Sequence, residues 1–219
     1  STSGWTFDST LGGLTIGKSA SGTDGTADKN VTVNSAINIA GPVSLYGGNV
    51  AINAALKASS VTLKGSGAVS QTGAITANDL LLLGGNVTLD HASNNVNTLA
   101  ASGVGSVKYW DSNALTIGTV SGTDGITATG AVDVQTLTGN LTVAKNLVTN
   151  DVTSGAVILN ASRSTNIASA APSVGADTAG DILIGNGASS TTGANGRVVL
   201  YTGSIDNSTG VDTAAGSGN

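Results

Sequence analysis

One pattern constrains the fold of this chain more than any other: a small residue separates two apolar residues, again and again. These triplets are Leu14–Ile16, Val31–Val33, Ile37–Ile39, Val43–Leu45, Val50–Ile52, Val61–Leu63, Val87–Leu89, Leu115–Ile117, Val132–Val134 and Leu141–Val143. Alternation of this kind predicts a β-strand of three or four residues whose apolar side chains point inward. Segments rich in Gly, Asn, Ser and Ala, such as Gly47–Asn49, lie between the triplets and favour tight bends.

The spacing of the triplets predicts how the strands are arranged. Every third strand begins 18 to 20 residues after the last, as in the pairs Val31 and Val50, Val43 and Val61, Val50 and Val69, Val61 and Leu80, and Val87 and Val107. Three short strands and three bends in about 19 residues predict one coil of a parallel β-helix, in which each coil pairs with the next. A chain of 219 residues would form about eleven such coils, about 50 Å long.

Two longer repeats support this spacing. Leu45–Val50 and Leu82–Val87 share the pattern Leu-x-Gly-Gly-Asn-Val and lie 37 residues apart, which is close to two coils. Leu14–Gly25 and Leu115–Gly125 share Leu-Thr-Ile-Gly followed by Ser-Gly-Thr-Asp-Gly, about five coils apart. The sequence therefore predicts an all-β solenoid.

Composition agrees with this fold and excludes several others. Gly, Ser, Thr and Asn make up 107 of 219 residues, and all 13 acidic residues are Asp, so most strong helix formers are missing. Eight Lys and Arg residues against a net charge of −5 argue against nucleic acid as a partner. No apolar run reaches the 18 residues of a membrane helix, so we expect no membrane insertion. Without cysteine there is no thiolate metal site, and no cofactor is predicted.

The triplets also suggest an internal division of the chain. Residues 1–160 are predicted to form the regular β-helix, 161–207 its continuation with longer loops, and 208–219 a frayed tail. Trp5 and Phe7 are expected to cover the open first coil, whose strand edges would otherwise invite aggregation, or to mark the point where a longer parent chain was cut. The chain begins at Ser1 without a leader, so either a signal has been removed or the chain is a piece of a longer protein; the second interpretation is favoured, and the piece is expected to be monomeric.

Few residues are suited to catalysis. His91 is the only histidine, lacks a suitable nucleophile, and is predicted to be a bend residue. The acids that could form a glycosidase pair are Asp24, Asp28, Asp79, Asp90, Asp111 and Asp124. None is adjacent to another acid, and each lies beside the small residues that accompany Asp in turns. We therefore expect no enzyme activity and no metal site.

Three binding hypotheses remain. Tyr109, Trp110 and Asp111 form the ligand-binding candidate, because an outward ring beside a carboxylate could stack on a sugar. The favoured interpretation is that both rings fill or cover a local gap in the stack of coils. Asp24–Asn30 offers oxygen ligands for calcium but lacks a known loop spacing, so an exposed corner loop is favoured. The outward threonines do not keep the 19-residue step that one flat ice-binding ladder requires.

Several motifs resemble one protein family. The motifs are Gly85–Leu89, Gly139–Val143, Leu115–Gly122 and Gly196–Gly203. They are similar to large filamentous-haemagglutinin-like adhesins, the two-partner-secretion exoproteins of Gram-negative bacteria. Because neither Pro42 nor Pro172 follows Asn, the Asn-Pro motifs of that family's secretion domain are absent, and the chain would come from the stalk or a later β-helical segment.

This resemblance implies a right-handed parallel β-helix and a biological role. The chain would be a repeat segment of a secreted virulence protein at the bacterial cell surface, serving cell adhesion or biofilm attachment. Its partners would be a host receptor or polysaccharide, and an outer-membrane secretion partner reached through other segments. The alternative is a glycan-binding or glycan-cleaving β-helix of the lyase or tailspike type, which would gather several Asp and a base on one face of successive coils.

Overall fold

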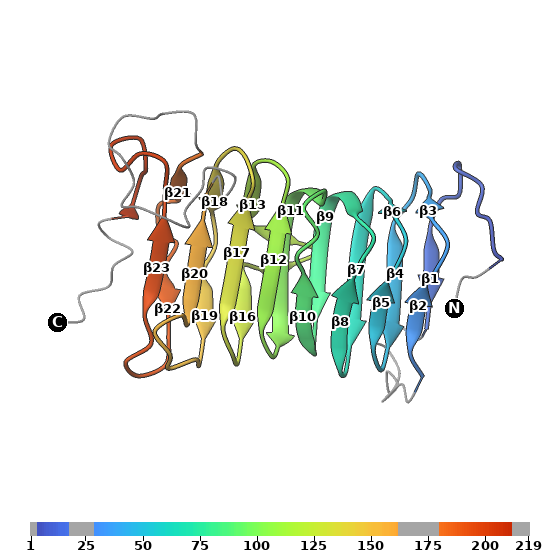
Figure 1. Ribbon diagram of the computed structural model, residues 1–219, viewed down its shortest axis with the longest axis horizontal. Helices are drawn as coiled ribbons and strands as arrows, with labels where there is room; N and C mark the ends of the chain where they lie inside the picture. Colours follow the sequence, from blue (N-terminus) through green and yellow to red (C-terminus); the bar gives the residue numbers. More distant parts are fainter. Residues whose placement is uncertain (1–3, 18–28, 162–179, 212–219) are drawn as a thin grey trace.

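The computed structural model describes residues 4–17, 29–161 and 180–211. Over these residues the chain is all-β, and its repeated strands form parallel sheets. Figure 1 shows the strands stacked side by side along the long axis of the molecule, with the first coils at one end and the last at the other. The prediction of an all-β fold with repeated parallel strands is confirmed.

One sheet contains eight parallel strands. In spatial order they are β2 (Val31–Val33), β5 (Val50–Ile52), β8 (Ala68–Gln71), β10 (Asn86–Leu89), β12 (Val107–Asp111), β17 (Val132–Thr136), β20 (Val157–Asn160) and β23 (Val198–Tyr201). Each coil of the chain contributes one strand to this sheet. Apolar residues at alternate positions point into the core, which leaves the residues between them on the outer face.

Apart from one two-stranded hairpin, the other strands belong to a 13-stranded sheet. Its main path is β1 (Leu14–Ile16), β4 (Val43–Gly47), β7 (Ser60–Gly65), β9 (Ile75–Leu83), β11 (Asn95–Val104), β13 (Leu115–Ile117), β18 (Leu141–Val143) and β21 (Ile182–Ile184). Off this path lie β3 (Ile37–Asn38), β6 (Leu56–Lys57), β16 (Ile126–Ala128), β19 (Leu147–Thr149) and β22 (Ser190–Thr191). The long strands β9 and β11 join the two rows, because β9 pairs with both β6 and β7.

The register of the strands can be compared with the residue pairs in which the repeat was found. The five residue pairs used to find the period, from Val31 and Val50 to Val87 and Val107, are all register partners. After Val107 the partners in the eight-stranded sheet are Val132, Val157 and Val198, so the steps lengthen to 25, 25 and 41 residues. The expectation of eleven coils is therefore too high, since the described part of this sheet has eight strands.

A β-hairpin accounts for part of the longer step. The strands β14 (Thr119–Val120) and β15 (Thr123–Asp124) pair antiparallel around Ser121 and Gly122, whose φ angles are 49° and 81°. Val120 packs with Leu81 and Ala100, which lie outside the main core. The second half of the Leu115–Gly125 repeat thus forms a projection on the 13-stranded sheet that the sequence did not predict.

The core runs without interruption through the stack. One cluster of buried Val, Leu, Ile and Ala side chains extends from Val31 to Ile182. At the first coil, Phe7 and Leu11 pack against this cluster as expected of a cap, whereas Trp5 is 63% exposed and contacts Phe7 with ring centroids 6.0 Å apart. At the last coil, Thr209 bridges Leu183, so the predicted tail of residues 208–219 begins in contact with the stack.

Candidate functional site

The candidate residues Tyr109, Trp110 and Asp111 lie together on β12, but they point to opposite sides of the sheet. Tyr109 and Asp111 are fully buried, whereas Trp110 is half-buried on the outer face. The prediction that one ring points inward and the other outward is confirmed. Neither Tyr109 nor Asp111 reaches a ligand on the surface, so only Trp110 of the three remains a surface candidate.

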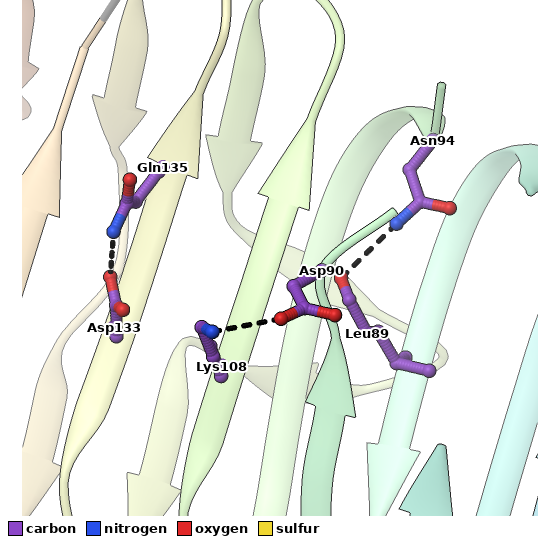
Figure 2. Close-up of polar contacts among 6 residues, drawn as sticks. All are labelled: Leu89, Asp90, Asn94, Lys108, Asp133 and Gln135. Atoms are coloured by element: carbon purple, nitrogen blue, oxygen red, sulfur yellow. Dashed lines mark hydrogen bonds and ion pairs between the residues drawn. The ribbon is translucent and has the colours of Figure 1, made fainter. Parts of the chain in front are cut away.

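Lys108 and Trp110 lie beside each other on the outer face. The Lys108 ammonium lies 4.7 Å from the centroid of the Trp110 ring, which is a cation–π distance. The same ammonium donates to Asp90 Oδ2 at 2.8 Å, and Figure 2 shows this contact. Because both side chains keep about a third or more of their surface exposed (41% and 31%), water screens the ion pair.

A second polar pair lies on the next strand, at the same height. Lys108 is the register partner of Asp133, and Trp110 is the register partner of Gln135. Gln135 Nε2 donates to Asp133 Oδ1 at 2.6 Å (Figure 2). Three successive coils thus place Asp90, Lys108 and Asp133 on one face, beside the half-buried indole of Trp110 and the buried amide of Gln135. This arrangement offers hydrogen-bond donors and acceptors beside an aromatic surface, as carbohydrate hydroxyls require.

Inside the stack, Asp111 is held by hydrogen bonds without a cation. Its Oδ2 accepts from the Tyr109 hydroxyl at 2.7 Å and from the Val96 amide at 2.9 Å, and its Oδ1 accepts from the Asn113 amide at 3.1 Å. Burial outweighs these bonds and raises the pKa of Asp111 to about 6, while burial and Asp111 together raise the pKa of Tyr109 well above its usual value. Asp111 therefore has a structural role: its carboxylate accepts a hydrogen bond from the amide of Val96, which has no acceptor on a neighbouring strand.

The same corner contains two side-chain amides that sequence reasoning missed, the buried Asn94 and the half-buried Gln71. Asn94 is fully buried; its Oδ1 accepts from the Ile75 amide at 2.9 Å, and its Nδ2 donates to Leu89 O at 3.1 Å (Figure 2). Asn94 also exchanges two hydrogen bonds with Gln71. Gln71 is the register partner of the buried Ile52. A polar residue one period after an apolar core residue could therefore have indicated this amide pair in the sequence.

The remaining acids and the histidine do not come together. His91 begins the turn after β10, where its Nδ1 accepts from the Ser93 amide at 3.1 Å, as predicted for a bend residue. Asp79 lies on β9, and Asp124 lies on the hairpin, where Lys145 contacts it at 3.1 Å. Asp24 and Asp28 lie outside the described residues, and with them most of the calcium candidate Asp24–Asn30.

A search of the described residues finds no group of three or more His, Cys, Asp or Glu side chains that could hold a metal ion. The same residues contain no helix of the length and apolarity needed to cross a membrane. Comparison of the chain with family models, with curated proteins and with solved structures finds no match.

Proposed function

We propose that this chain is a non-catalytic segment of right-handed parallel β-helix from a large secreted adhesin of the filamentous-haemagglutinin kind. It serves as part of the fibre stalk and as an attachment surface for host cells or biofilm polysaccharide at the surface of a Gram-negative bacterium. Export occurs by two-partner secretion, through segments other than this one.

The observation that supports this proposal most is the unbroken register of the eight-stranded sheet. Val31, Val50, Val69, Val87, Val107, Val132, Val157 and Val198 follow one another as register partners. At about 4.8 Å per step, the seven steps span about 34 Å with one core beneath them. A repeat in which each coil contacts only its neighbours can be lengthened by adding coils, which is what a spacer in a surface fibre needs.

Attachment needs accessible side chains, and these vary between the coils while the core stays apolar. In the register of the outer face, Ser70, Thr88, Lys108 and Asp133 occupy equivalent positions on successive strands. The scaffold therefore carries different surface groups at fixed spacing without a change in its core.

The test is a binding and turnover experiment on the purified chain. Fluorescently labelled protein is applied to a glycan array and to epithelial cells, and candidate polysaccharides are assayed for new chain ends. Saturable binding without cleavage supports the attachment function. Cleavage of any polysaccharide contradicts the proposal of a non-catalytic segment.

Glycan recognition is the second candidate, and the position of Trp110 favours it. Its ring lies on the outer face, with the Lys108 ammonium 4.7 Å from its centroid and Gln135 as its register partner on the next strand. Trp110→Ala should abolish glycan binding through this face, whereas Trp5→Ala removes a 63% exposed ring at the first coil and should leave binding unchanged. Equal binding by the two variants would contradict this candidate.

A further inference from the structure

The turns on either side of β22 each contain an exposed asparagine that is followed by glycine. These pairs are Asn186 with Gly187, and Asn195 with Gly196. In such a pair the amide nitrogen of the glycine can attack the side-chain carbonyl carbon of the asparagine, because glycine has no Cβ to block the approach. The attack needs a free glycine N–H and room for the backbone to rotate. Since the two pairs are alike in sequence and exposure, their surroundings decide which one reacts.

The turn that contains Asn186 leaves the Gly187 amide free to react. The Ala188 amide donates to Gly185 O at 3.0 Å, and Gly187 has a φ of 83°. This is a type II turn with Asn186 at its second position, so the turn hydrogen bond uses the amide of the fourth residue. In the part of the chain that the structure describes, the Gly187 N–H and the Asn186 side chain have no hydrogen-bond partner. A Cβ on Gly187 would have nothing within 4 Å, so the peptide has room to rotate.

The turn that contains Asn195 holds the attacking nitrogen in place. Asn195, with a φ of 65°, occupies the third position of this turn, so the Gly196 amide is itself the turn donor and lies 2.9 Å from Gly193 O. Gly196 O also accepts from Thr192 Oγ1 at 3.1 Å. A Cβ on Gly196 would lie 2.5 Å from Asp151 O, so the backbone is closely packed there. The Gly196 nitrogen is therefore both hydrogen-bonded and confined.

We propose that Asn186 is a site of spontaneous deamidation and that the fold protects Asn195. As the Gly187 nitrogen loses its proton it bonds to Asn186 Cγ, the Cγ–Nδ2 bond breaks, and Nδ2 leaves as ammonia. The product is a cyclic succinimide. Water then adds to one of the two ring carbonyl carbons and breaks the bond of that carbon to the Gly187 nitrogen. Addition at Cγ gives aspartate, and addition at the backbone carbon gives isoaspartate. This modification is independent of the proposed function.

The two products change the last coils differently. Either acid adds a negative charge to a chain whose net charge is −5. Aspartate keeps the backbone of the turn, whereas isoaspartate lengthens the main chain by one carbon between β21 and β22. Ile184 and Ala188, on the two sides of this turn, pack against the core, and Ser190 of β22 is the register partner of Leu147. The isoaspartate form should therefore disturb the pairing of β22 with β19, and the aspartate form should not.

Peptide mapping by mass spectrometry tests the proposal on the full chain, incubated either folded or in guanidinium chloride. In the denatured chain both pairs should convert at similar rates. In the folded chain Asn186 should convert at least about tenfold faster than Asn195, because a turn hydrogen bond must break before the Gly196 nitrogen can attack. The rate at Asn186 should rise with hydroxide concentration, since the Gly187 nitrogen must lose its proton.

Asn186→Gln is the matched control, because the longer side chain disfavours ring closure. This variant should lose the fast conversion and keep the fold, which circular dichroism establishes. A protease that cleaves before aspartate but not before isoaspartate separates the two products at residue 186. Equal conversion of the two pairs in the folded chain, or conversion of neither while the denatured chain reacts, would overturn the proposal.

Discussion

Replacement of Asp111 with asparagine should change how the stability of the protein depends on pH. Burial raises the pKa of Asp111 from its usual 3.8 to about 6. An acid whose folded pKa is raised binds its proton more tightly in the folded state than in the unfolded state. Its contribution to stability is therefore complete below pH 3.8 and is lost as the pH rises through about 6.

The magnitude follows from the size of the pKa change. One pKa unit corresponds to about 1.4 kcal/mol, so a rise from 3.8 to about 6 corresponds to about 3 kcal/mol. Asparagine does not titrate, and the hydrogen bond it loses at the Asn113 amide is lost at every pH. The free energy of unfolding of the native chain minus that of Asp111→Asn should thus fall by about 3 kcal/mol between about pH 2.5 and pH 7.5.

Urea unfolding followed by circular dichroism at several pH values measures this difference. Asp124→Asn is the control, because the pKa of the exposed Asp124 is lowered by its hydrogen bonds to Thr119 and Lys145. Its difference curve should slope the other way, since that stability is lost as the pH falls. A curve for Asp111→Asn that is flat, or that rises with pH, would refute the reasoning.

Three further predictions concern packing; thermal unfolding measures the first two, and binding of a hydrophobic dye measures the third. Gly125→Ala places a methyl group 2.0 Å from the Asn146 carbonyl oxygen at a φ of 62°, so it should destabilise the chain by at least about 3 kcal/mol. Gly103→Ala is the control: its φ is similar but the space around it is open, so it should cost about 1 kcal/mol. Leu82→Ala should cost about 2–5 kcal/mol through a cavity in the core, and a loss below about 1 kcal/mol would contradict the burial of that side chain. Val120→Ser should loosen the hairpin and expose the patch beneath it to a hydrophobic dye, without unfolding the sheets.

The strands could be predicted from the sequence because local pattern and tertiary position coincide. In a stack with one core, apolar residues at alternate positions indicate both a β-strand and burial. Triplets such as Leu14–Ile16 and Leu141–Val143 are therefore strands in the structure with the bounds that the sequence predicted. The period followed for the same reason, since Val31 must lie under Val50. The hairpin could not be predicted because Val120 packs with Leu81 and Ala100 outside the main core. The 19-residue spacing of core strands says nothing about contacts outside that core.

The candidate site was predicted only in part. Alternation correctly divided Tyr109 from Trp110, but it also sends Asp111 inward, and the sequence gives no reason to expect a buried carboxylate there. The buried acid is explained by the register: β11 and β13 pair only at Thr98 and Leu99, so the amide of Val96 needs a side-chain acceptor. The Lys108–Asp90 contact joins residues 18 apart and becomes visible only once the coils are stacked.

The distance between two labelled strands tests most directly whether parallel coils stack in register to form a rod. The chain has no cysteine, so spin labels can be placed at Thr32→Cys and Ile158→Cys, two outward positions connected by six register steps. Electron–electron resonance, with an excess of unlabelled chain to dilute contacts between copies, should give one narrow peak near 29 Å, from about 4.8 Å per step. A broad distribution, or a peak far from this value, would contradict the stacked rod.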